Sequence, residues 1–107
     1  MVSSLLLALH LVATDPAKAR ASYMACLSAF ARQSAEQRLT KEAFDTALAS
    51  ACKTEEAAFR KMSVDFDVSR GIGRKISEEG VGDEIRDIQL SARERFDLES
   101  EAPPPPE

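Results

Sequence analysis

Apolar residues recur at intervals of three and four along most of this 107-residue chain. Such spacing puts them on one face of a helix, and it predicts three helical segments. The first runs from Pro16 to about Gln33, the second begins after Thr40 and continues through Phe66, and the third runs from Asp83 to about Leu98. The expected inward positions are Ala19, Tyr23, Cys26, Leu27 and Phe30; Ala43, Phe44, Ala47, Leu48, Ala51, Cys52, Phe59, Met62 and Phe66; and Ile85, Ile88, Ala92 and Phe96.

Capping residues mark where the first two helices begin. Asp15 can accept hydrogen bonds from free amides, and Pro16 suits the first turn of a helix, where no N–H is needed. Between the two helices the segment 34–40, SAEQRLT, interrupts the apolar pattern. Ser34 can open a capping box, and Thr40 is a second possible N-cap. We expect residues 34–40 to form a turn.

The second segment contains two ambiguous stretches. Thr54, followed by Glu55 and Glu56, either restarts a helix or lies within a continuous one. Residues 62–69, MSVDFDVS, alternate apolar and polar side chains, which is a strand pattern. A lone strand would leave its backbone groups unpaired, and the chain contains no second good strand. Helix is therefore the better interpretation.

All four glycines lie between residues 71 and 82, in GIGRKISEEGVG. Each costs a helix about 1 kcal/mol relative to alanine. Two interpretations remain open: the helix is broken or bent here, or it stays intact and the glycines let another backbone approach closely. The final residues, 99–107, contain four consecutive prolines and are expected to form a disordered tail. Residues 14–98 are expected to form one helical domain.

Residues 1–13, MVSSLLLALHLVA, form an apolar segment without lysine or arginine. The run from Leu5 to Ala13 is too short to span a bilayer and is typical of a signal-peptide core. We expect export to the periplasm or beyond, with cleavage after Ala13 or, alternatively, after Ala19. The alternatives are an uncleaved segment that tethers the protein to the inner membrane, and a buried N-terminal helix in a cytosolic protein.

Composition and charge exclude several functions. Residues 55–107 carry fourteen acidic and eight basic side chains, which argues against nucleic acid as a partner because phosphates require clustered cations. Cleavage would also remove His10, the only histidine. The mature chain would then lack a Ser-His-Asp triad, a Cys-His pair and any histidine-ligated metal site.

Two short motifs resemble ligand-binding sequences but fail on inspection. Asp65, Asp67 and Ser69 match the start of a calcium loop, yet its sixth position is Arg70 and its twelfth is Ile76, where glycine and glutamate are required. GIGRKI has two glycines at dinucleotide-motif spacing but no preceding strand. We therefore expect no cofactor, no metal site and no catalytic residues.

The two cysteines are the most informative pair. Cys26 and Cys52 lie equally far from position 39, inside the predicted turn. An antiparallel helical hairpin would place them opposite each other, on apolar faces, so export would favour a disulfide. In a cytosolic protein they would instead be two buried thiols. A redox-active pair is less favoured because CxxC spacing is absent.

The run CLSAFARQSAEQRLTKEAFDTALASACKTEEAAFRKM, residues 26–62, resembles a group of small exported helical proteins of Gram-negative bacteria. These share a leader, an early cysteine, an EAFDTAL-like helix and a second cysteine followed by glutamate and Ala-Phe. The resemblance covers about a third of the chain. It implies export and the cysteine pairing, and it implies no activity.

The sequence thus predicts an all-α protein: an antiparallel helical hairpin linked by a disulfide, followed by a C-terminal helical arm with a glycine-rich bend. We expect a non-enzymatic periplasmic structural or protein-interaction module. The arm leaves four residues without an obvious core, and these form a possible face for a protein partner or self-association: Ile72, Ile76, Val81 and Ile85. The alternatives are a membrane-tethered accessory protein and a thiol redox protein using Cys26 and Cys52.

Overall fold

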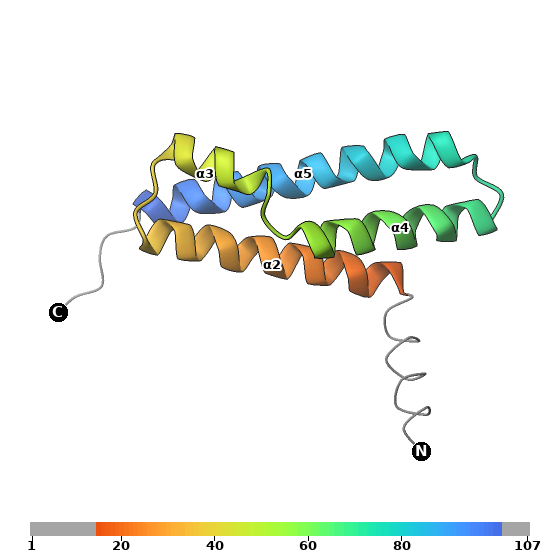
Figure 1. Cartoon of the computed structure of the whole chain (residues 1–107), viewed down its shortest axis with the longest axis horizontal. Coiled ribbons are helices and arrows are strands. Elements are labelled where there is room, and N and C mark those ends of the chain that lie inside the picture. Colours follow the sequence, from red (N-terminus) through yellow and green to blue (C-terminus); the bar gives the residue numbers. More distant parts are fainter. Residues whose placement is uncertain (1–14, 102–107) are drawn as a thin grey trace, which may run out of the picture.

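The computed structural model describes residues 15–101, and within them the chain forms four helices (Figure 1). These are α2 (Pro16–Glu36), α3 (Lys41–Leu48), α4 (Lys53–Ser69) and α5 (Arg74–Glu101). The chain runs along α2, returns through α3 and α4, and turns back along α5 (Figure 1). Helices α2, α4 and α5 pack against one another in pairs, and α3 contacts α5. The described chain is therefore an all-α packed bundle.

The predicted helix starts are confirmed by their capping geometry. The amide of Ala17 donates to Oδ1 of Asp15 at 2.9 Å, with Pro16 in the first turn of α2. The amide of Ala43 donates to Oγ1 of Thr40 at 3.1 Å and caps α3. The prediction for Ser34 was wrong: α2 continues to Glu36, and Ser34 lies buried inside it.

The predicted second helix of the hairpin is divided into two helices, α3 and α4. Cys52 adopts a left-handed backbone conformation, with φ of 58°, immediately before α4 begins at Lys53. Of the two interpretations left open, the restart is correct, and Glu55 and Glu56 lie in the first turn of α4. The alternating stretch 62–69 is helical throughout.

The glycine-rich segment breaks the chain only at its beginning. Gly71, with φ of +92°, ends α4 in a Schellman motif, in which the amides of Gly71 and Ile72 donate to the carbonyls of Val68 and Asp67. α5 then begins at Arg74, nine residues before the predicted start, and passes straight through the last two glycines. A Cβ added at Gly80 would meet nothing within 4 Å, so close backbone approach does not explain that residue.

The C-terminal helix is not the free arm that the sequence suggested. α5 lies along both α2 and α4, and its inward residues join the common core. It extends to Glu101, beyond the predicted end at Leu98. The predicted signal peptide and most of the predicted tail fall on residues 1–14 and 102–107, outside the described part of the chain. Among residues 15–101, no helix is long and apolar enough to cross a membrane.

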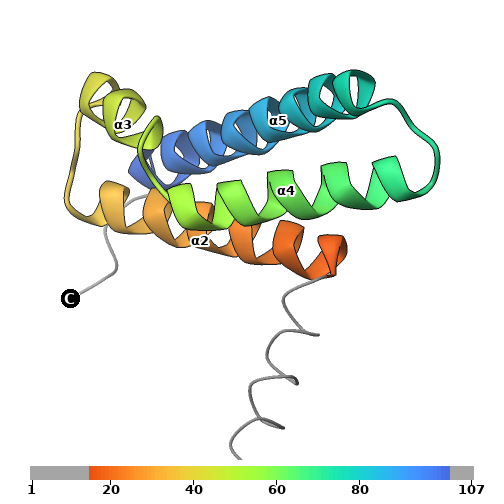
Figure 2. The same ribbon diagram turned by 45° about the vertical axis from the view of Figure 1, so that its right-hand side comes forward.

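All four helices contribute to one hydrophobic core. At one end of it three phenylalanine rings stack: Phe44 from α3 lies between Phe30 of α2 and Phe96 of α5, with ring centroids 5.3 and 4.1 Å apart. The buried apolar residues are Tyr23, Leu27, Ala31, Phe44, Leu48, Phe59, Val64, Val81, Ile85, Ile88, Ala92 and Phe96. Figure 2 shows α3 standing apart from α2 along part of its length, and the phenylalanine stack, buried Leu48 and the ion pair of Asp45 with Arg93 attach it to the bundle.

Candidate functional site

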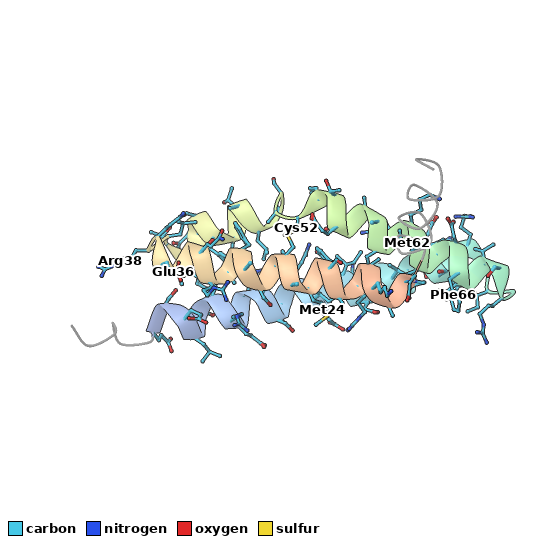
Figure 3. All side chains as sticks on the ribbon, turned by 90° about the horizontal axis from the view of Figure 1, so that it is seen from below. Met24, Glu36, Arg38, Cys52, Met62 and Phe66 are labelled. Atoms are coloured by element: carbon cyan, nitrogen blue, oxygen red, sulfur yellow. A yellow bond between two sulfur atoms is a disulfide. The ribbon has the colours of Figure 1, made fainter. Side chains whose placement is uncertain are left out.

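The predicted disulfide is present. It joins Cys26 in α2 to Cys52 before α4, with the two Cα atoms 6.1 Å apart (Figure 3). Both cysteines of the chain are used. Beside the bond, a shallow and mainly apolar depression of about 570 Å³ separates α2 from α3, and Ala47 and Ala51 form part of its wall. The disulfide thus joins α2 to the α3–α4 connection at the edge of this depression.

A polar network lies under the groove between α4 and α5. The phenol of Tyr23 donates to Oε1 of Glu56 at 3.3 Å. Nε2 of Gln89 donates to the Tyr23 oxygen at 3.3 Å and to Glu56 at 3.4 Å. Each helix of the main bundle contributes one member, so the network satisfies the polar end of a tyrosine that is otherwise fully buried. Burial, together with the Glu56 carboxylate, raises the pKa of Tyr23 above its ordinary value, against the opposing hydrogen bond from Gln89.

We predict that folding becomes less favourable as the pH rises through the tyrosine range. The neutral phenol is favoured in the folded state, so its contribution is complete below the ordinary pKa of 10.0 and is lost as the pH rises through the higher folded value. Tyr23 is the only tyrosine and the chain has no tryptophan, so absorbance at 295 nm reports it alone. Its titration should lie at higher pH in the folded than in the urea-unfolded chain. Coincident curves would contradict this, and Tyr23→Phe supplies the blank.

The groove above this network is lined by charged side chains of both signs. It encloses about 680 Å³, and both helices contribute charges of both signs to its walls: Lys53, Glu56 and Arg60 from α4, and Glu78, Glu79, Asp83 and Arg86 from α5. Within residues 15–101 no group of histidine, cysteine or carboxylate side chains could hold a metal ion. Of the rejected calcium motif, Asp65 accepts from Lys61 and Asp67 from Ser77.

The partner face predicted from the sequence is divided by the structure. Ile72 and Ile76 are 43% and 70% exposed. Val81 and Ile85 are only 7% and 3% exposed, because α5 begins early enough to bring them against α2 and α4. The assignment of Val81 and Ile85 to a partner face was therefore wrong, since they belong to the core; the inward position that the helical pattern predicted for Ile85 is confirmed.

Phe66 joins the two exposed isoleucines, although the sequence pattern placed it inward. It is 46% exposed, and the Arg70 guanidinium lies over its ring at 5.4 Å. Figure 1 shows the reason: the end of α4 projects beyond the start of α2, so within residues 15–101 α2 does not cover it there. Figure 3 shows Phe66 near this end of the molecule. We call residues 66–76, the end of α4, the connection and the first turn of α5, the α4–α5 tip.

The tip has a defined conformation. The Schellman motif fixes the end of α4, and Oγ of Ser77 donates to Oδ2 of Asp67 at 2.7 Å, which ties the start of α5 to α4. Arg74 lies 3.9 Å from Asp65, and Lys61 donates to the same carboxylate at 2.7 Å. The Lys61 hydrogen bond holds the pKa of Asp65 below its usual value. The exposed apolar side chains are thus carried by an ordered turn.

The fold and these sites define a small disulfide-linked helical bundle with an apolar tip. No protein-family model matches the chain, and searches of curated proteins and of solved structures find no similar protein. The resemblance to small exported proteins therefore stays a prediction from residues 26–62. The disulfide indicates an oxidising compartment.

Proposed function

We propose that this protein is a non-enzymatic structural and interaction module of the bacterial cell envelope, exported to the periplasm, which docks onto another envelope component through its α4–α5 tip. One observation carries the proposal: large apolar side chains gather at the tip of an otherwise compact bundle. Phe66, Val68, Ile72 and Ile76 are all exposed within eleven residues. Clustered exposed apolar side chains mark interaction sites more often than scattered ones do.

Two further observations support this proposal. The disulfide and the phenylalanine stack link the helices to one another away from the tip. The described residues also offer the tip no covering element of their own, since α2 begins short of it (Figure 1). Exposed apolar side chains such as Ile72 and Ile76 lower the solubility of a protein, and binding to a partner would remove them from water.

Photocrosslinking in cells tests the proposal with a matched control inside one helix. A benzophenone amino acid is placed at position 76 or at position 98, because Ile76 and Leu98 are both 70% exposed and both lie on α5. Position 76 should give several-fold more adduct with envelope components, protein or lipid, because only that position lies at the tip. Equal adduct at both positions would defeat the proposal.

A further inference from the structure

We propose that the α4–α5 tip binds the surface of an anionic lipid bilayer. The inference rests on the proposed function and names what the tip docks onto. Its starting point is the composition of the tip, where Arg70, Arg74 and Lys75 are interleaved with Ile72 and Ile76. Side chains that combine apolar bulk with neighbouring cations suit the boundary between lipid headgroups and acyl chains.

Positive charge is concentrated at this end of the molecule. Residues 66–77 carry three cations and one carboxylate, whereas the rest of α5, residues 78–101, carries nine carboxylates and three cations. Asp67 accepts a hydrogen bond from Ser77, and the neighbouring Asp65, 3.9 Å from Arg74, accepts one from Lys61, a further cation. An anionic surface would therefore attract the tip and repel the body of α5, which orients the bundle end-on.

The geometry of the tip allows cations and apolar side chains to contact a bilayer together. The Arg70 guanidinium lies over the Phe66 ring, so a cation and an exposed aromatic side chain stand together on the same surface of the tip. Ile72 follows Gly71 directly, in the connection that forms the outer end of the bundle (Figure 1). The α4–α5 connection protrudes beyond the start of α2, and the headgroup layer of a bilayer is soft enough to surround such a protrusion.

The charge of the tip also argues against a second copy of the chain as the occupant. Two tips meeting each other would bring together two sets of Arg70, Arg74 and Lys75, and like charges in contact oppose association. The larger depressions of the bundle, between α4 and α5 and beside the disulfide, are lined by residues other than Phe66, Ile72 and Ile76. The exposed apolar side chains of the tip thus lie on a protruding end and outside the depressions, an arrangement that suits insertion into the headgroup layer of a bilayer.

Vesicle flotation of the full chain tests the inference. We expect binding to vesicles of phosphatidylglycerol and phosphatidylethanolamine, weaker binding at high salt, and little binding to phosphatidylcholine vesicles. Arg70→Gln with Lys75→Gln should lower the partition coefficient by about 25-fold, at about fivefold for each cation. Ile76→Ser should lower it by about tenfold.

Matched controls lie at the opposite end of the bundle. Lys41→Gln with Arg95→Gln removes two cations from α3 and the end of α5, and Leu98→Ser removes an apolar side chain as exposed as Ile76. Both controls should bind like the unaltered chain. Residues 1–13 are present in every variant, so differences among the variants report the tip alone, and circular dichroism verifies that each is folded.

The outcomes separate this inference from the proposed function. Equal vesicle binding by tip and control variants, or no preference for phosphatidylglycerol, overturns the lipid inference. If position 76 nevertheless crosslinks to a defined protein, the tip is a protein-docking site and the proposed function stands. If vesicle binding ignores the tip and position 76 gives no more adduct than position 98, both proposals fall.

Discussion

Phe44→Ala lowers the free energy of unfolding by about 3–5 kcal/mol, the range found when a buried phenylalanine is truncated. Phe44 is fully buried and stacks on two other rings, with the Phe96 ring only 4.1 Å away and nearly parallel. The loss is a large fraction of the stability of a domain this size, which is of the order of 5–15 kcal/mol. Urea denaturation followed by circular dichroism measures it.

The same substitution should release α3 before the rest of the bundle unfolds. α3 has only eight residues, and isolated helices shorter than about 12 residues are marginal in water. Hydrogen exchange at the amides of α3 should therefore accelerate more than exchange in α2 or α5. Phe66→Ala is the control, because it removes the same ring from an exposed position and should cost less than about 1 kcal/mol. Equal costs for the two substitutions would contradict the burial pattern.

Removing the disulfide with Cys26→Ser and Cys52→Ser should cost about 3.5 kcal/mol, as expected for cross-linked residues 26 apart. That loss corresponds to a melting temperature lower by about 15–25 °C. The physical cause is mainly the freedom that the unfolded chain regains. The bond also joins α2 to the connection where Cys52 holds a left-handed conformation, so its loss should loosen the link between α3 and α4.

Reductant provides the internal control for this second prediction. It should lower the melting temperature of the unaltered chain to that of the double serine variant and leave the variant unchanged. A stabilising disulfide should also have a reduction potential below about −300 mV, whereas a value near the thioredoxin potential of about −270 mV or above would favour the redox alternative. A variant as stable as the unaltered, oxidised chain would refute the structural role of the bond.

Several features of the fold could be predicted from local pattern. The caps at Asp15 and Thr40 depend on residue type next to a periodic segment, and both are present. Cys26 and Cys52 could be paired because a hairpin brings positions equally far from its turn together. The helical state of residues 62–69 followed from the absence of a partner strand.

The candidate site was predictable only in part. Ile72 and Ile76 were assigned to an exposed face because the predicted hairpin left them without an obvious core, and both are exposed. Val81 and Ile85 were assigned to the same face wrongly, because the sequence did not show that α5 packs along both α2 and α4. The helical pattern by itself had placed Ile85 inward, and there it was correct. Phe66 was assigned inward, because a periodic pattern specifies a face of a helix and does not say whether another helix covers it. The cations of the tip are present in the sequence as RGIGRK, but only the structure shows that they lie beside exposed isoleucines.

The sequence by itself determined that the chain is helical, where α2 and α3 begin, and which two cysteines meet, because these depend on spacing and capping along a short stretch of chain. Only the tertiary structure decided which apolar residues remain exposed. That outcome depends on how far α4 and α5 extend past the start of α2, a relation between helices distant in sequence. Burial is a property of the assembled bundle, so the exposed tip could not be predicted from local sequence.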